Sequence, residues 1–331
     1  MHLEEVSWTP ADRWCDATNR DRPQLTTFES FDLIDEAVVA GAERLHIYVS
    51  DPQRRGDLGK LIAYARKAGI TTIIEGESAE CFDEQTLAAF ARAGAHAVIV
   101  PLHHVDELQR VENVVQTIRR FGMEAEITST FTLLNIDDLA AMALLVETMQ
   151  ATLWIVRFGS FEGPTAENHL TPELIEEAFS LLYRSMRDTA IKISTPDAPH
   201  FKRYVMQRLS WNPLRTRDDR CNVAMPTAKE SQSEHAHLHV DCDGAIRPDR
   251  DFSMSTGNIR DLPLDVIFRE APLLVQLRDP RALHGRCGVC EFKRICGGYR
   301  PRAFAHTHDP LDEDPACTYK PATKPLGVAH V

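Results

Sequence analysis

Short apolar runs alternate with longer amphipathic segments between residues 44 and 194. The runs are four to eight residues long and rich in β-branched side chains, which is typical of buried strands. The segments between them, such as residues 57–69, 105–122 and 135–150, have helical periodicity, and Thr171-Pro172 is typical of a helix start. The pattern therefore predicts repeated βα units, with strands at RLHIYVS (44–50), TTIIEG (71–76), HAVIVPL (96–102), EAEITSTF (124–131), TLWIVRFG (152–159) and IKIS (191–194).

Buried parallel strands of this kind form an open sheet or a full or partial β/α barrel, with the functional residues at the C-terminal strand ends. The alternation stops near residue 200, and the next stretch is polar and irregular. We therefore predict an α/β barrel-like domain over residues 1–210, a linker over 211–235 and a small second domain over 236–331.

Composition narrows the possible partners. The chain has 331 residues, with 37 Lys and Arg against 49 Asp and Glu, which gives a formal net charge of −12. An acidic chain without a basic run lacks the electrostatic footprint of a protein that binds nucleic acid or an anionic membrane, so neither partner is expected. The N-terminal MHLEEVSWTP does not have the positive charge of a signal peptide. We expect a cytoplasmic protein whose eight cysteines are metal ligands or free thiols rather than disulfides.

Four of the cysteines form a constellation in the second predicted domain. Their spacing is Cys287-x2-Cys290-x5-Cys296-x20-Cys317. Four thiolates on short loops can hold one zinc ion or one [4Fe-4S] cluster, and the spacing alone leaves both open, with inert thiols as the third reading.

The sequence around these cysteines resembles the C-terminal SPASM or twitch domain of radical S-adenosylmethionine (radical SAM) enzymes. The similarity rests on D-G-A-I-R-P, T-G-N-I, H-G-R-C-G-V-C-E-F, I-C-G-G-Y-R-P-R-A and D-E-D-P-A-C. It implies that Cys287, Cys290, Cys296 and Cys317 bind one [4Fe-4S] cluster. A second auxiliary cluster is not expected, because Asp249 and Arg300 stand where that family has cysteines.

The resemblance extends through the first domain, with one departure at its start. Family members carry T-x-x-C-x3-C-x2-C after the first strand, where this chain reads TPADRWCDATN. Thr9 matches the threonine, but Asp12, Asp16 and Asn19 replace the cysteines, and carboxylate and amide oxygens bind iron–sulfur clusters poorly. The family's G-G-E-P also reads Val49-Ser50-Asp51-Pro52. The cluster that cleaves S-adenosylmethionine is therefore expected to be absent, and this cofactor is not expected to bind.

These features predict an iron–sulfur protein whose cluster is structural or relays electrons. The barrel would bind a peptide, a tetrapyrrole or a partner enzyme of a biosynthetic pathway, and whether it is catalytic stays open. The phrase TPDAPHFKRY around His200 resembles the tetrapyrrole-modifying branch of the family.

The alternative is a barrel enzyme that uses a non-cluster metal or haem. Its catalytic candidates are Asp16, Asp51 and His103, since carboxylates bind hard metals and His103 ends a predicted strand. Histidines at a spacing of two residues share one face of a strand. Candidates for a second metal site are Asp12, Asp16, His104, His237 and His239. The aspartates could instead be surface residues, His103 and His104 could cap a helix or face solvent, and His237 and His239 could lie on a solvent-facing strand edge.

Overall fold

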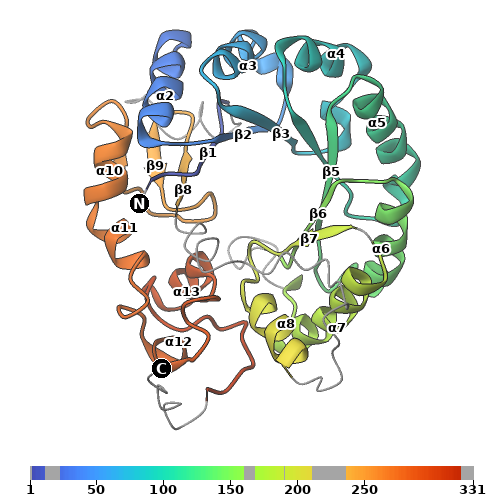
Figure 1. Ribbon diagram of the computed structural model, residues 1–331, viewed down its shortest axis with the longest axis vertical. Helices are drawn as coiled ribbons and strands as arrows, with labels where there is room; N and C mark the ends of the chain where they lie inside the picture. The colour runs from blue at the N-terminus through green and yellow to red at the C-terminus, as the bar shows by residue number, and fades with distance from the viewer. Residues whose placement is uncertain (1, 12–22, 160–167, 190, 211–235, 322–331) are drawn as a thin grey trace.

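The computed structural model describes residues 2–11, 23–159, 168–189, 191–210 and 236–321. Their strands form one ten-stranded sheet in the order β10-β9-β8-β1-β2-β3-β4-β5-β6-β7. Figure 1 shows the sheet curving around a central space with helices on its outer side. The strands β10 and β7 are the edges of the sheet and do not pair with each other, so the barrel is open.

The first seven strands are parallel neighbours in chain order. They are β1 (Glu5–Trp8), β2 (Arg44–Val49), β3 (Thr71–Gly76), β4 (Ala97–Pro101), β5 (Glu124–Thr130), β6 (Leu153–Arg157) and β7 (Lys192–Ser194). All six predicted strands are confirmed. The strand β1 escaped prediction because its four residues are too few for a clear periodic pattern.

Helices connect the strands and cover the outer face of the sheet (Figure 1). The helix α2 begins with a capping box: the Thr26 side chain accepts a hydrogen bond from the Glu29 amide, and the Glu29 carboxylate accepts one from the Thr26 amide. The barrel helices are α2 (Thr27–Ala40), α3 (Leu58–Lys67), α4 (Glu84–Ala93), α5 (Leu108–Arg120), α6 (Leu139–Thr148), α7 (Pro172–Asp188) and α8 (His200–Ser210). Thr171 caps α7 as predicted, with its side chain accepting from the Leu174 amide.

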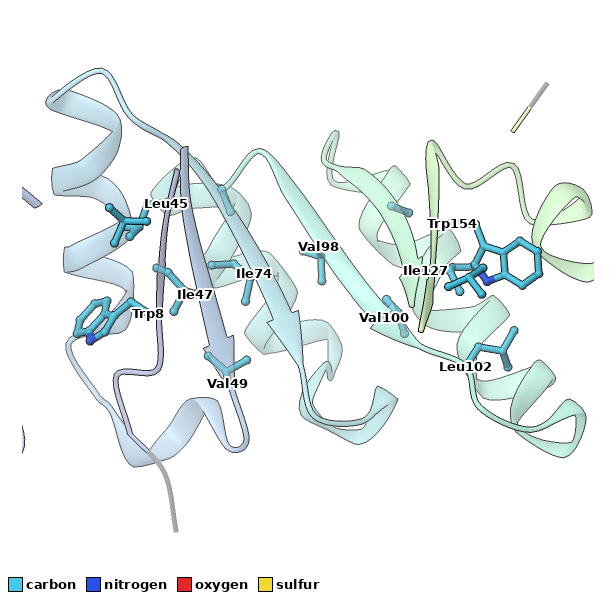
Figure 2. Close-up of a cluster of buried hydrophobic side chains, with 14 of the residues drawn as sticks. Trp8, Leu45, Ile47, Val49, Ile74, Val98, Val100, Leu102, Ile127 and Trp154 are labelled. Atoms are coloured by element: carbon cyan, nitrogen blue, oxygen red, sulfur yellow. The ribbon is translucent and has the colours of Figure 1, made fainter. Parts of the chain in front are cut away.

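The alternation of side chains along each strand separates an apolar outer face from a polar inner face. Figure 2 shows the outer set, which packs under the helices: Trp8, Leu45, Ile47, Val49, Ile74, Val98, Val100, Leu102, Ile127 and Trp154. The intervening residues point the other way. Several of these are charged or polar: Glu5, Ser7, His46, Tyr48, Glu75, Thr128 and Arg157. The inner face therefore carries charged and polar side chains among apolar ones and is not a wholly apolar core.

The segment from residue 236 onward begins by extending the same sheet. The strand β8 (His237–Val240) pairs parallel to β1, and β9 (Ala245–Arg247) and β10 (Gly257–Asn258) follow antiparallel. Short helices complete it: α10 (Leu264–Glu270), α11 (Pro272–Leu277), α12 (Gly285–Val289) and α13 (Arg300–Thr307). A small separate core of Phe252, Leu277, Leu283 and Leu311 lies beneath them. The predicted division into two domains stays a prediction, and its linker, 211–235, lies outside the described residues.

None of the helices in the described ranges has the length and apolar composition needed to cross a bilayer.

Candidate functional site

A cavity of about 750 Å³ opens at the C-terminal ends of the barrel strands. Its walls come from strand ends, the loops that follow them, and the turn after β9. The lining includes Thr9, Tyr48, Ser50, Glu75, His103, Thr128, Thr130, Arg157, Asp197, Arg250 and Asp251. The cavity is therefore at the place where a β/α fold is expected to keep its functional residues.

The carboxyl group of Glu75 and the hydroxyl group of Tyr48 differ in protonation state in this cavity. His46 Nε2 lies 2.9 Å from Glu75 Oε2. Burial raises the pKa of Glu75, but His46, Arg157 and Arg250 outweigh burial and lower it to about 2. Burial and the charge of Glu75 raise the pKa of Tyr48 well above its usual range. At neutral pH the cavity wall thus presents an ionised Glu75 beside a neutral Tyr48.

Two of the predicted catalytic residues, Asp51 and His103, lie in the part of the chain that the structure describes, and of these two His103 lines the cavity. The Thr130 amide donates to His103 Nδ1 at 3.1 Å, and burial lowers the pKa of the imidazole. The ring is therefore neutral with its proton on Nε2. The backbone of His103 is also fixed, because its amide donates to Glu107 and its carbonyl accepts from Asn135. His103 is positioned to donate one hydrogen bond from Nε2.

Asp51 and His104 lie elsewhere. Asp51 is exposed at the N-cap of η1 (Pro52–Arg54), where its side chain accepts from the Gln53 amide at 2.9 Å. His104 is exposed at the start of η3 (Val105–Glu107), and neither residue lines the cavity. The structure gives both a local role at the start of a helical turn. Asp12, Asp16 and Asn19 fall outside the described residues.

His237 and His239 share one face of β8, as predicted, and meet at Ser7 of β1. The Ser7 hydroxyl lies 2.9 Å from His237 Nε2 and 2.9 Å from His239 Nδ1. His239 Nε2 lies 3.4 Å from Asp241 Oδ1, although burial still lowers the pKa of His239. Across the described ranges no three His, Cys, Asp or Glu side chains are grouped to hold one metal ion. The second metal site stays a prediction.

The four predicted cysteine ligands line one pocket in the C-terminal segment. Cys287 lies in α12, Cys290 follows that helix, and Cys296 and Cys317 come from the flanking loops. A four-iron cluster takes one thiolate per iron, so its ligands surround a volume instead of sharing one ion. The pocket thus has the donor set of a [4Fe-4S] cluster.

Hydrogen-bond donors surround the sulfurs of this pocket. The Gly298 amide donates to Cys296 Sγ at 3.4 Å, and the Asp314 amide donates to Cys287 Sγ at 3.5 Å. Arg300 directs its guanidinium to Cys287 Sγ at 3.7 Å. Such donors stabilise thiolate and tune a bound cluster. The residues present therefore fit an iron–sulfur group.

Burial changes the pKa values of three of the four cysteine thiols in this pocket. It raises the pKa of Cys290 and Cys317, and it raises the pKa of Cys296 well above its usual range. A metal must therefore displace protons to bind these sulfurs. Cys242, by contrast, is paired in a disulfide, so the expectation that disulfides are absent is wrong for this residue.

Gly298 lets the chain pass close to the cysteines. Its φ of +73° lies in the left-handed region. A Cβ here would lie 2.9 Å from the Asp314 Cβ and 3.2 Å from Cys287 Sγ. The glycine of I-C-G-G-Y is required both by backbone conformation and by space.

Three residues connect the cysteine pocket to the barrel cavity. Asp314 lines the cysteine pocket, and Arg302 Nε donates to its carboxylate at 2.9 Å. The same guanidinium donates to the backbone carbonyl of Asp197, whose residue lines the barrel cavity. Tyr299 makes a second connection, because its amide donates to Asp314 and its hydroxyl donates to Asp251 at 2.6 Å. The two pockets therefore belong to one polar network.

Asp197 gives this network a pH dependence. Its side chain is buried, and Oδ2 accepts from the Phe158 amide at 2.7 Å. Burial raises the pKa of Asp197 to about 6 despite the nearby Arg302 and Arg157. An unfolded Asp titrates near ~3.9, so the folded chain binds this proton more tightly. The resulting stabilisation, about 3 kcal/mol, is complete below pH ~4 and is lost as the pH rises through about 6.

We therefore expect Asp197→Asn to remove a negative contribution to the pH dependence of the free energy of unfolding between pH 4 and pH 6, so that the free energy rises more steeply with pH in the variant than in the wild type. Urea denaturation at stepped pH measures this slope. Asp35→Asn, on the exposed side of α2, is the matched control and should leave the slope unchanged. A wild-type slope in Asp197→Asn would contradict the assignment of the shift to this residue.

Sequence reasoning missed several lining residues. Glu75 and Arg157 stand at the ends of apolar strands, in TTIIEG and LWIVRF. A charged residue at the end of a buried run was a usable signal. Asp197 and Asp314 lie within the quoted phrases TPDAPHFKRY and D-E-D-P-A-C but were not singled out there, and Arg250 lies in a loop whose position depends on tertiary contacts.

Comparison with known proteins agrees with this architecture. No protein-family model matches the chain. The AdoMet-dependent heme synthase of Methanosarcina barkeri is 24% identical over 91% of this chain and 89% of its own length. The AdoMet-dependent heme synthase of Oleidesulfovibrio alaskensis is 26% identical over 91% of this chain and 81% of its own.

Among solved structures, SuiB of Streptococcus suis bound to S-adenosylmethionine is similar in fold. It is 15% identical, with a TM-score of 0.69, and the match covers 96% of this chain and 78% of SuiB. SuiB has also been solved bound to its precursor peptide SuiA. The relatives along the whole sequence and the shared fold agree with the resemblance found in the sequence: this chain is similar to AdoMet-dependent heme synthases in sequence and to SuiB in fold, which supports a relationship to the radical S-adenosylmethionine superfamily.

Proposed function

We propose that this chain is an iron–sulfur protein that binds a tetrapyrrole in its barrel cavity and does not cleave S-adenosylmethionine. One observation carries the proposal. A pocket of four cysteines is joined, through Asp314, Arg302 and Asp197, to a cavity of about 750 Å³ at the strand ends. The arrangement joins a candidate site for a redox-capable group and a ligand cavity in one polar network.

The first part of the proposal is one [4Fe-4S] cluster on Cys287, Cys290, Cys296 and Cys317. Support comes from the shared pocket of the four sulfurs and from the amides of Gly298 and Asp314 that donate to them. When bound, such a cluster supplies one-electron transfer or structural cross-linking. The four thiolates would hold it in place. A zinc ion is the other outcome of a metal measurement.

The second part concerns the ligand of the barrel. Relatives that match 91% of this chain are named AdoMet-dependent heme synthases, which supports a tetrapyrrole. Small-molecule pockets commonly measure ~300–1,000 Å³, and the cavity falls in this range. A peptide or a partner enzyme is the competing ligand. The likeness to SuiB concerns the fold and does not by itself favour a peptide.

The third part is the departure from those relatives. Their names state a dependence on S-adenosylmethionine, and SuiB binds it. In this chain Asp12, Asp16 and Asn19 replace the three cysteines of the cleaving cluster. Asp51, in the segment that replaces G-G-E-P, is used as the cap of η1. These substitutions support a barrel that has kept its cavity and lost the radical chemistry.

The test is a titration of S-adenosylmethionine into the anaerobically purified chain under dithionite. We expect no saturable binding below about millimolar concentration and no 5′-deoxyadenosine. Saturable binding with 5′-deoxyadenosine release would contradict the third part.

The alternative function, a barrel enzyme with a non-cluster metal or haem, is supported by His103, which lines the cavity. A stoichiometric second metal that His103→Ala removes would favour this alternative. If iron is present at cluster stoichiometry only, the alternative fails.

A further inference from the structure

Two arginines line the barrel cavity without a hydrogen-bond or ion-pair partner among the described residues. Arg157 is the last residue of β6, and Arg250 lies in the turn that follows β9. Both line the cavity, and the Arg250 guanidinium carbon lies 4.1 Å from the centre of the Tyr48 ring. The fold thus brings two positive charges from distant parts of the chain to one wall.

Neither guanidinium forms a hydrogen bond or an ion pair within the part of the chain that the structure describes. This separates them from the buried arginines elsewhere. Arg55 pairs with Asp57, Arg203 with Glu176, and Arg302 with Asp314. A guanidinium presents five donors in a planar fork that matches an oxyanion. Arg157 and Arg250 keep that capacity free for a ligand.

The acidic residues around the two arginines are engaged with other groups. Glu75 is at ion-pair distance from His46, and Asp251 accepts from the Tyr299 hydroxyl. Asp197 accepts from the Phe158 amide. These three carboxylates would repel a doubly charged phosphate more than a singly charged carboxylate. The local charge therefore favours a carboxylate as the anion.

Orphaned polar atoms mark the same wall. Ser50 Oγ, Thr128 Oγ1 and Asp197 Oδ1 are buried and lack a hydrogen-bond partner among the described residues. All three residues line the cavity. Buried polar atoms in native proteins are nearly always paired, so three unpaired ones in one wall mark that wall as polar. They belong to the same cavity lining as the two arginines.

We infer that Arg157 and Arg250 form the carboxylate-binding site of the barrel cavity and anchor the acidic side chains of its small-molecule ligand. This inference rests on the proposed function for the identity of the ligand, but the site itself does not require a tetrapyrrole. The rest of the ligand would lie along the strand ends.

The test uses the full chain, purified anaerobically with its cluster, and coproporphyrin III as the probe. Fluorescence titration compares the wild type with Arg157→Gln, Arg250→Gln and the control Arg120→Gln, whose exposed side chain pairs with Glu84 on the outer surface. We expect each cavity variant to weaken binding by about 10- to 100-fold, the effect of losing a charge-assisted hydrogen bond. The control should stay within about twofold, and the tetramethyl ester of the probe should bind at least about tenfold more weakly.

Additional variants and ligands distinguish a failure of the carboxylate-site inference from a failure of the tetrapyrrole proposal. Arg157→Lys keeps the charge and should retain part of the affinity, which a misfolded variant would not. Wild-type affinity in both Gln variants would overturn the inference and leave tetrapyrrole binding intact. If the wild type fails to bind coproporphyrin III but binds succinate in a manner that Arg157→Gln abolishes, the carboxylate site stands and the tetrapyrrole proposal falls. Tighter binding of inorganic phosphate than of succinate would overturn the carboxylate assignment.

Discussion

Substituting Cys296 by alanine is expected to remove nearly all iron and acid-labile sulfide from the protein. Cys296 lies in the pocket with Cys287, Cys290 and Cys317, and its sulfur accepts from the Gly298 amide. Three remaining thiolates leave one iron of a [4Fe-4S] cluster without a protein ligand, and such clusters are readily lost. Iron and sulfide should fall from about four of each per chain to below about one. Colorimetric analysis of the anaerobically purified variant measures both.

The matched control is Cys81→Ala. Cys81 is also a free, half-buried thiol, but it lies in the barrel and donates to the Ser50 carbonyl at 3.2 Å. Its loss should leave iron and sulfide at the wild-type values. Full cluster content in Cys296→Ala would refute the ligand assignment. A variant that lost one zinc and no sulfide would instead show that the cysteines hold a structural metal.

The second large effect concerns Arg302. The Arg302–Asp314 pair is almost fully buried, with 1% of each side chain exposed, and it joins α13 to the cysteine pocket. Arg302→Met fills the same space but leaves the Asp314 carboxylate buried without its cation. Breaking one side of a buried pair costs about 3–5 kcal/mol. The free energy of unfolding, measured by urea denaturation at pH 7, should fall by this amount.

Arg269→Met is the control for the loss of an arginine. Arg269 pairs with Asp265 four residues earlier on the exposed face of α10, a contact worth about 0.5 kcal/mol or less. If both variants lose the same small amount, the buried pair does not stabilise the chain as described. Because the Arg302 guanidinium also donates to the Asp197 carbonyl, Arg302→Met should in addition weaken ligand binding in the barrel cavity.

The barrel strands could be predicted because each buried run carries its own signal. Residues 71–76 were predicted to the residue, since TTIIEG combines β-branched side chains with a terminal glycine. The position of β8 beside β1 could not be predicted, because this pairing joins residues about 230 positions apart. Nothing local to EVSW or HLHV states that the two segments meet.

The polar inner face shows a second limit. The runs RLHIYV and LWIVR read as buried strands, and the polar members of each run looked like exceptions in an apolar sequence. In the structure His46, Tyr48 and Arg157 alternate regularly with apolar neighbours and face the interior of the barrel. When both faces of a strand are buried, the sequence alone does not show which of its residues face the helices and which face the interior of the barrel.

Some residues of the candidate site could be predicted from the sequence and others could not. The cysteine spacing predicted that four thiols would come together, and the structure places all four in one pocket. His103 was identified from its place after an apolar run. Asp314 and Arg302, which connect the two pockets, lie within the motifs D-E-D-P-A-C and I-C-G-G-Y-R-P-R-A, but their pairing could not be predicted, because a buried ion pair is defined only by the tertiary fold.

The measurement that tests the account most directly is the iron, sulfide and zinc content of the wild-type chain after anaerobic purification. One cluster on Cys287, Cys290, Cys296 and Cys317 predicts about four irons and four sulfides per chain and no zinc. About eight irons and eight sulfides would contradict it, because a second cluster would then be held elsewhere in the chain and the loss of the cleaving cluster could not stand. About one zinc without sulfide would remove the iron–sulfur assignment itself.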